Sequence, residues 1–230
     1  MNDFTSGPFD GNEWPDKLNA HIVSTDEKPT VYGYDVEEDL VRHYHFTDFI
    51  FLTLTGELPA SNKSAAFEIA MFFLAPITVA EAPSHAAGLA QLCGGSTSSV
   101  LATGMVALAE QARFLLEKHT CFLEWLDGKM EKLPDVFFAK DDAERASVKR
   151  MTRLIKGTEL DVPALQLGLT RTASLIAVFY ECGLNRREWI ETAFVLARSP
   201  CVAAEALAVS PGNLRGYPMN LPRFHYEKRP

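Results

Sequence analysis

The sequence has 230 residues, of which 47% are hydrophobic and 23% charged, a composition typical of a soluble globular protein with one sizeable domain. Acidic residues outnumber basic ones by 30 to 22, and the resulting net charge of −8 argues against a nucleic-acid partner, which requires a basic surface. The same balance leaves room for a phosphorylated ligand, because a local arginine cluster can bind one on an acidic protein.

No targeting segment, membrane span or metal site is expected. The N-terminus (MNDFTSGPFDGNEW) lacks the basic start and apolar core of a signal peptide. The longest apolar stretch, near residues 67–80, contains Glu68 and Pro76 and is too short to span a bilayer. The cysteines have no metal-ligand spacing and lie in apolar helical contexts, so we predict buried free thiols in a reducing cytoplasm for Cys93, Cys121, Cys182 and Cys201.

Short strands are predicted only at the N-terminus. Residues 1–34 carry Gly and Pro at several positions and are predicted to form an extended arm, in which 21–25 and 30–34 could be short strands. From residue 35 to about 208, apolar residues recur with the helical period. The predicted helices are 35–42, 46–54 (ending at Gly56), 63–74, 83–92, 98–125, 142–155, 161–183 and 185–208.

Two segments depart from this helical pattern. Residues 127–142 are the most loop-like interior segment, and a basic helix follows them. The tail from residue 211 is rich in Pro and Gly and is predicted to be extended. Because no strand pattern is long enough for a central sheet, the sequence predicts an all-α fold.

The helix predicted over 98–125 contains several small residues close together. Small side chains let two helix backbones approach each other, so this helix is expected to run close to another helix. We predict that the small residues lie at a dimer interface; they are Ala102, Gly104, Ala107 and Ala109.

Three segments, taken in order, resemble the citrate synthase and citryl-CoA lyase superfamily. The first joins residues 33–40 (GYDVEEDL) to 55–59 (TGELP), and the second begins at 83–89 (PSHAAGL). The third combines 182–184 (CGL) with 196–200 (LARSP). The resemblance covers most of the chain, and the order of the segments carries more weight than any single motif.

The resemblance implies a large helical domain at 35–210, between an N-terminal arm at 1–34 and an extended C-terminal tail at 211–230, with 127–157 as a reduced small domain. Members of the superfamily are dimers that bind an acyl-CoA between two domains and make or cleave a carbon–carbon bond next to a thioester. This chemistry uses a carboxylate base and histidines that polarise two carbonyls. We therefore expect a homodimer, or a heteromer with a citrate synthase-like homologue, that takes a CoA thioester or a small carboxylate as ligand and needs no further cofactor.

The positions that match the family's catalytic residues carry other side chains. The loop with the first catalytic histidine aligns with residues 109–113 (AEQAR), and the segment with the second aligns with 137–145 (FFAKDDAER). The catalytic aspartate aligns near Arg171 and Thr172, and a substrate-binding histidine aligns with 79–82 (VAEA). A threonine cannot act as a carbanion-forming base at neutral pH. The sequence therefore predicts that the chain alone does not perform the family reaction.

Arginines are the strongest candidates for ligand binding. Arg198 aligns with a family arginine that pairs with a substrate carboxylate, and it lies in an otherwise apolar helix. A buried arginine needs an anionic partner, which could equally be an internal Asp or Glu. Arg171 lies in the preceding helix and Arg223 in the tail that the family sends across the dimer; for both, a surface ion pair is the alternative.

Histidines and acidic pairs are weaker candidates. His85, just after the Pro-Ser turn, could serve as an acid or contact an anion, and the alternative is a solvent-facing or helix-capping histidine. His43 and His45 are two residues apart on a helical segment and do not share a face, so they make a poor metal pair. Glu110 and Glu117 could pair on one helix face, although a solvated face is the simpler interpretation.

Two classes of function stay open. A divergent enzyme would keep acyl-CoA or polycarboxylate binding and use other residues for catalysis. A catalytically silent member would be a regulatory or scaffold subunit, paired with an active homologue through the family's dimer face. The arginines favour retained anion binding, and the missing histidines and aspartate favour silence.

Overall fold

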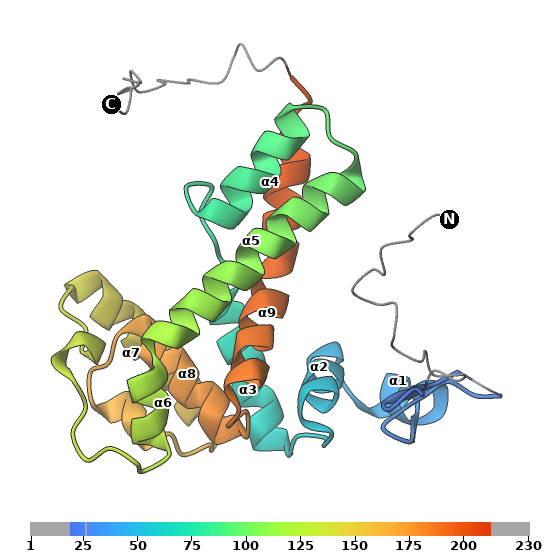
Figure 1. Cartoon of the computed structure of the whole chain (residues 1–230). Helices are drawn as coiled ribbons and strands as arrows, with labels where there is room; N and C mark the ends of the chain where they lie inside the picture. Colours follow the sequence, from blue (N-terminus) through green and yellow to red (C-terminus); the bar gives the residue numbers. More distant parts are fainter. Residues whose placement is uncertain (1–18, 26, 213–230) are drawn as a thin grey trace, which may run out of the picture.

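The computed structural model describes residues 19–25 and 27–212. Within them the chain is mostly helical with one small sheet, which confirms the predicted all-α class (Figure 1). Two predicted helix ends are also confirmed, because Gly56 and Gly183 take positive φ angles of 81° and 117° directly after a helix. The helical segments are η1 Val36–Leu40, α1 Val41–His43, α2 Phe46–Thr55, α3 Ser61–Leu74, α4 Ala82–Leu92, α5 Thr97–Lys118, α6 Thr120–Leu126, η2 Asp135–Phe137, α7 Asp142–Lys156, η3 Pro163–Gln166, α8 Arg171–Cys182 and α9 Arg187–Ala208.

The N-terminal end folds as a three-stranded antiparallel sheet of order β1-β2-β3. The strands β1 Val23–Ser24 and β2 Thr30–Val31 fall in the two predicted strand segments, and β3 Tyr34–Asp35 adds a third. Tyr32 and Gly33, both with positive φ, form the tight turn between β2 and β3. Residues 1–18 of the predicted arm lie outside the described residues.

The body of the molecule is built around α8. Side chains from Ala173 to Phe179 are buried on every side of this helix, because α3, α6, α7 and α9 all pack against it. Phe179 meets Phe67 of α3 edge-on at 5.7 Å between ring centroids, and Phe67 meets Phe51 of α2 in the same way at 5.4 Å. These aromatic contacts tie α2, α3 and α8 into one core.

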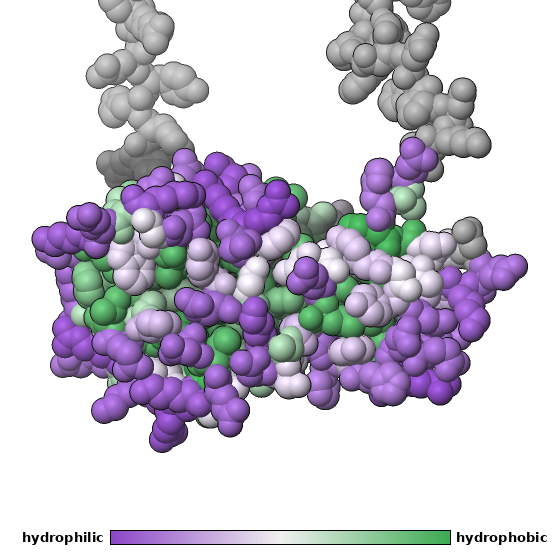
Figure 2. All heavy atoms as spheres, turned by 90° about the horizontal axis from the view of Figure 1, so that it is seen from below, coloured by the Kyte–Doolittle hydropathy of each residue, from purple (hydrophilic) through white to green (hydrophobic). Residues whose placement is uncertain are grey.

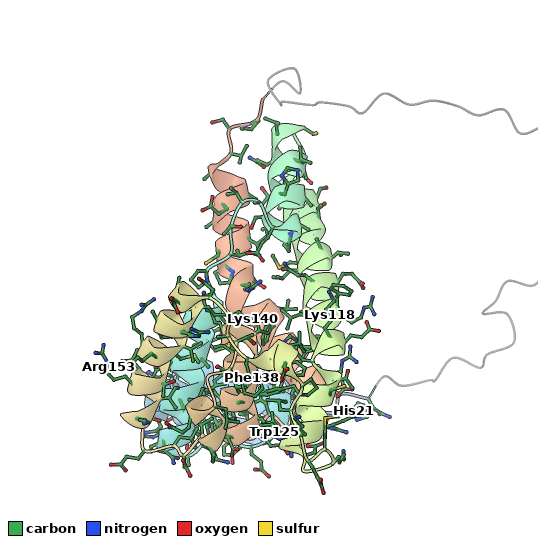
Figure 3. The ribbon with its side chains drawn as sticks, turned by 90° about the vertical axis from the view of Figure 1, so that its left-hand side faces the viewer. His21, Lys118, Trp125, Phe138, Lys140 and Arg153 are labelled. Carbon is green, nitrogen blue, oxygen red and sulfur yellow. The ribbon has the colours of Figure 1, made fainter. Side chains whose placement is uncertain are left out.

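Three helix segments project from the body as an arm, formed by α4, the first part of α5 and the second part of α9 (Figures 1 and 3). Gly104 lies where the three helices meet: a Cβ atom there would sit 2.8 Å from Val202 Cγ1 and 3.0 Å from Ala87 Cβ. Gly104 therefore serves packing within the chain, and the prediction that it lies at a dimer interface is wrong. The arm has a small core of its own, made of Ala87, Val100, Leu108, Val202 and Ala206.

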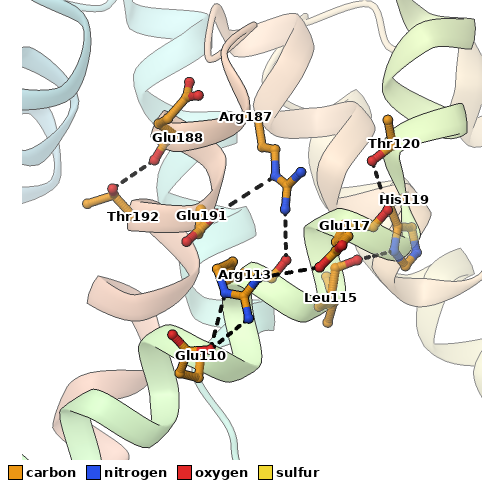
Figure 4. Close-up of polar contacts among 10 residues, drawn as sticks. All are labelled: Glu110, Arg113, Leu115, Glu117, His119, Thr120, Arg187, Glu188, Glu191 and Thr192. Carbon is orange, nitrogen blue, oxygen red and sulfur yellow. Dashed lines mark hydrogen bonds and ion pairs between the residues drawn. The ribbon is translucent and has the colours of Figure 1, made fainter.

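The helix predicted over 98–125 is in fact two helices that are separated at His119. Side chains satisfy the carbonyl groups at the end of α5: Thr120 Oγ1 donates to the Glu117 carbonyl at 2.8 Å, and His119 Nδ1 lies 2.7 Å from the Leu115 carbonyl (Figure 4). Such side-chain bonds offer the backbone an alternative to continuing the helix. The apolar pattern continues on both sides of this break, so the prediction of one helix over 98–125 is wrong at His119.

The helix predicted over 161–183 is also divided. Gly168 takes a positive φ of 72° between η3 and α8. The Thr170 hydroxyl then accepts a hydrogen bond from the Ala173 N–H at 3.3 Å and caps α8. The segment before this cap pairs with the loop after α6, since Ala139 N–H donates to the Gly168 carbonyl at 2.9 Å. The division into a large domain and a reduced small domain at 127–157 stays a prediction.

α9 carries Pro200 in its interior, where the helix passes from the body into the arm. Proline has no N–H, so the Leu196 carbonyl lacks its usual helical donor. The neighbouring Ser199 hydroxyl donates to the Val195 carbonyl at 2.6 Å.

The cysteines differ in exposure. Cys182 is fully buried in the body, and burial raises the pKa of its thiol to about 12. Cys93 and Cys121 are exposed and Cys201 is half-buried, so the prediction of buried thiols is right for Cys182 and wrong for Cys93 and Cys121.

α5 is long and apolar enough, by length and composition alone, to cross a membrane, a property that the sequence analysis overlooked. In this fold α5 packs between α4 and α9, but only 28% of its most apolar stretch is buried. Val106 and Phe114 remain exposed on its outer face. The underside of the molecule is predominantly polar with apolar patches between charged side chains (Figure 2). A cytoplasmic location stays a prediction.

Candidate functional site

Arg198 of α9 lies in a polar cluster at the junction of body and arm. Its Nη1 is 3.2 Å from Glu81 Oε2, and its Nε donates to the Leu74 carbonyl at 3.2 Å. Nη1 also donates to Gln111 Oε1 at 3.5 Å, and Gln111 Nε2 donates to Glu81 Oε2 at 2.9 Å. An internal carboxylate thus supplies the anion that this arginine requires.

Arg171 and Arg198 both bind the carboxyl end of α3. Arg171 Nη2 donates to the Phe73 carbonyl, next to the Leu74 carbonyl that Arg198 binds. The last carbonyls of a helix have no partners within the helix, and cations at that end also interact favourably with the helix dipole. Two of the predicted arginines therefore meet, and the surface ion pair considered for Arg171 is replaced by this backbone contact. We call Glu81, Gln111, Arg171 and Arg198 the Arg198 cluster.

The charges in the Arg198 cluster are mutually dependent. Burial lowers the pKa of Arg198; the Glu81 carboxylate opposes this effect, and nearby Arg171 adds to it. Burial raises the pKa of Glu81, but hydrogen bonds from the Thr78 N–H and Gln111, together with the charge of Arg198, outweigh it and lower the pKa overall. Both groups are therefore ionised at neutral pH.

The cluster is closed. The hollow beside Arg198 measures about 10 Å³, which is too small for an organic ligand while Glu81 keeps this position. Glu81 keeps 31% of its side chain exposed, whereas Arg198 keeps 17%, so the carboxylate is the more accessible of the two partners. A ligand carboxylate could reach Arg198 only by displacing Glu81.

Of the two remaining predicted site residues, the structure describes His85, which does not join this cluster. His85 lies on the first turn of α4, is exposed and lines a shallow hollow of about 220 Å³ with Glu205 and Val209. Arg223 lies outside the described residues. Among the residues that are described, no group of three or more His, Cys, Asp or Glu side chains could hold a metal ion.

Glu110 and Glu117 do not form a carboxylate pair. Arg113 lies between them on the exposed face of α5, with Nη2 2.9 Å from Glu110 Oε2 and Nη1 3.5 Å from Glu117 Oε2 (Figure 4). The Arg113 carbonyl accepts from Arg187 of α9 at 3.1 Å. Arg113 therefore pairs with both glutamates on the solvated face of α5, and its carbonyl connects α5 to α9 through Arg187.

His119 is a residue that the sequence analysis missed. The first catalytic histidine of the family aligns with 109–113, and the helix predicted over 98–125 runs through His119. In the structure that helix ends at Lys118, and His119 is the next residue. A histidine that follows the Ala-rich helix was the available signal, and the prediction of one continuous helix concealed it.

The chemistry of His119 follows from its surroundings. Nδ1 is 2.7 Å from the Leu115 carbonyl, which can only accept, so in the neutral ring Nδ1 carries the proton and Nε2 is free to accept one. Burial lowers the pKa of the imidazole, and the bond to the Leu115 carbonyl partly opposes this. The ring is therefore neutral at pH 7 and could act as a base at Nε2.

Segments that align with the family's catalytic positions meet at His119. The ring of Phe137, which begins the 137–145 segment, lies 5.4 Å from the His119 ring. The Phe137 carbonyl accepts from the Thr170 N–H at 2.7 Å, directly before the first turn of α8. The fold thus gathers these segments. In the sequence resemblance, the segment 137–145 that matches the second histidine contains no histidine, and the aspartate matches near Thr172.

No protein-family model and no curated protein matches the sequence. Among solved structures, the chain is similar to citryl-CoA lyase from Hydrogenobacter thermophilus, with a TM-score of 0.66 and 18% identity over 93% of this chain and 96% of that one. It is also similar to ATP citrate lyase from Methanosaeta concilii in complex with (3S)-citryl-CoA, with a TM-score of 0.58 and 16% identity. A third similar structure is ATP citrate lyase from Methanothrix soehngenii in complex with citrate and coenzyme A, with a TM-score of 0.57 and 14% identity.

The matches differ in how much of each protein they cover. The match to each ATP citrate lyase covers 92% of this chain but 43% of that chain. The match to the citryl-CoA lyase covers 96% of that chain. Its small size is therefore shared with that lyase. The sequence resemblance and the structural similarity agree, and the chain has the helical fold of the citryl-CoA lyase-like proteins.

Proposed function

We propose that this chain is a citryl-CoA lyase-like protein that binds a CoA thioester or a small di- or tricarboxylate but does not make or cleave the carbon–carbon bond. The ion pair between Arg198 and Glu81 carries the proposal, because the arginine matched to a substrate contact is partly buried and already holds a carboxylate. A ligand carboxylate would replace Glu81. Once Glu81 has moved away, the positive charges of Arg198 and Arg171 are no longer balanced, and they attract an anion.

The lack of turnover is proposed from the side chains at the matched positions. Thr172 offers a hydroxyl in place of a carboxylate, and the segment 137–145 offers no histidine. General acid–base groups typically contribute about 10²- to 10⁴-fold each, so a site without them retains binding and little rate.

Thermal-shift measurements with citrate, oxaloacetate, CoA and acetyl-CoA test the binding. A ligand that binds only the folded state raises the melting temperature. We expect at least one of them to raise the Tm of the wild-type chain and none to do so for Arg198→Ala, which should still unfold cooperatively. Arg113→Ala, an exposed arginine on α5, is the matched control and should respond like the wild type. A wild-type chain that responds to no ligand contradicts the proposal.

A second candidate function is cleavage of citryl-CoA with His119 as the base. Its Nε2 is available to accept a proton, and its ring lies beside the segments matched to catalytic ones. The purified chain should then cleave citryl-CoA, and His119→Asn should abolish the activity while His85→Asn leaves it unchanged. Absence of turnover by the wild-type chain excludes this candidate.

We also propose that the chain assembles, as a homodimer or with a citrate synthase-like homologue as a silent regulatory or scaffold subunit. The exposed apolar face of α5, with Val106 and Phe114, supports self-association. Light scattering should report a dimer for the wild type and a monomer for Val106→Glu. Val136→Glu, at an equally exposed position of η2, should leave the dimer intact. A wild-type monomer at micromolar concentration argues against the homodimer.

A further inference from the structure

One face of α7 gathers positive charge on a chain that is acidic overall. This helix contains five basic and two acidic residues, whereas the whole chain has a net charge of −8. Four of the basic residues are exposed and, within residues 19–25 and 27–212, form no ion pair; they are Lys149, Arg150, Arg153 and Lys156. We call these four residues the α7 basic face.

The orientation of the α7 basic face is fixed by the opposite side of the helix. Val148, Met151 and Ile155 are buried in the body, so α7 cannot rotate to bring its cations toward other groups. Arg153 points away from the body into solvent (Figure 3). Lys149, Arg153 and Lys156 follow one another at helical spacing and span roughly 10 Å along the axis.

Two adjoining hollows follow this face. The first measures about 560 Å³ and lies along the helix among the basic side chains, including Arg150 and Arg153. The second measures about 360 Å³ and lies between α7 and the segment 165–169, with Arg145 at one end. They share Lys149, Thr152 and Lys156 as a common edge. The first hollow is open to solvent and lined by α7 alone, whereas the second has walls from two segments of the chain.

We propose that the α7 basic face binds a compact ligand that carries two or more phosphate groups. Arginine and lysine are the side chains that bind phosphate oxygens most strongly, and arginine can do so through two parallel hydrogen bonds. The short span of the face matches a di- or triphosphate. A long polyanion such as nucleic acid would extend past it onto an otherwise acidic chain and be repelled. The site uses no residue of the Arg198 cluster and does not depend on the proposed function.

Isothermal titration of the full chain with sodium tripolyphosphate at low ionic strength tests this proposal. The test variant is Lys149→Gln/Arg153→Gln, and the matched control is Arg113→Gln/Lys118→Gln, which removes the same charges from exposed positions of α5. We expect the wild type and the control to bind equally and the α7 variant to bind at least about tenfold more weakly, because each lost contact is a charge-assisted hydrogen bond. Added salt should weaken binding in all three.

Further titrations identify the kind of phosphate ligand and distinguish the α7 site from the proposed function at Arg198. ATP that binds more tightly than tripolyphosphate identifies a nucleotide-type ligand, and equal affinities identify the phosphate chain alone; both results support the site. Arg198→Ala should bind tripolyphosphate as the wild type does. The proposal is overturned if the wild type does not bind, if both double variants lose affinity equally, or if a single-stranded oligonucleotide binds more tightly than tripolyphosphate.

Discussion

The guanidinium of Arg198 holds the carboxylate of Glu81 at 3.2 Å, across 117 residues of sequence. The same guanidinium binds the Leu74 carbonyl at the end of α3, so one side chain joins α9, α3 and the start of α4. Arg198, the strongest ligand-binding candidate from the sequence, therefore also holds elements of the fold together. The two roles predict different effects when Arg198 is substituted.

Replacing Arg198 with Ala should lower the free energy of unfolding by about 2 to 3 kcal/mol, because Glu81 loses its counter-charge in a partly buried site. Urea denaturation measures the change. Arg113→Ala, which removes an exposed ion pair, should change the free energy by no more than about 0.5 kcal/mol. Equal effects of the two substitutions would mean that the Arg198–Glu81 pair contributes nothing to the fold.

Replacing Glu81 with Gln should make stability less sensitive to acid. The pKa of Glu81 is lowered in the folded chain, so its contribution is present above the unfolded pKa of about 4.3 and is lost as the pH falls through the folded value. At pH 7, Glu81→Gln should be less stable than the wild type by about 1 to 2 kcal/mol. Denaturation at several pH values should show this gap closing below about pH 4; a gap of constant size from pH 7 to pH 3 contradicts the prediction.

His119 should make stability depend on pH in a higher window. Burial lowers its pKa in the folded chain, so the unfolded chain binds the proton more readily, and stability should fall as the pH drops below about 6.5. His119→Asn can keep the donor to the Leu115 carbonyl and carries no titrating group. Melting temperatures between pH 8 and pH 5 should fall more for the wild type than for this variant, and parallel curves would show that His119 is not the titrating group.

Gly104→Ala should destabilise the arm. The added methyl group would lie 2.8 Å from Val202 Cγ1, which forces the three arm helices apart and should cost about 1 to 3 kcal/mol. Gly88→Ala on α4 is the matched control, since its Cβ would have no neighbour closer than 3.8 Å. There the substitution should stabilise the helix by up to about 1 kcal/mol. Calorimetry of the two variants separates close packing from helix propensity.

The sequence was sufficient where the signal was local. The predicted helix over 35–42 begins at Asp35, whose Oδ1 accepts from the N–H groups of Glu37 and Glu38 at 2.8 and 2.9 Å. Gly56 and Gly183 were predicted to end helices, and both take the left-handed conformation that glycine permits. Each of these features depends on residues within one turn of helix.

The sequence was insufficient where partners lie far apart in the chain. An anionic partner for Arg198 was expected, but nothing local distinguished an internal carboxylate from a ligand, and Glu81 is brought to it by the packing of α4 against α9. The break at His119 involves side-chain bonds from His119 and Thr120 that compete with helix continuation, and the apolar pattern continues on both sides of it. Because that break was missed, the histidine nearest to the matched catalytic segments was missed with it.

Pro200 sets where the molecule can bend. It follows Arg198, which binds the end of α3 in the body, and precedes Val202, which packs in the core of the arm. With one backbone hydrogen bond missing at this point, α9 is more easily bent here than elsewhere along its length. Any tilt of the arm about this hinge would change the distance between Arg198 on one side and Glu81 at the base of α4 on the other. Opening of the ion pair and swinging of the arm are therefore expected to be a single motion.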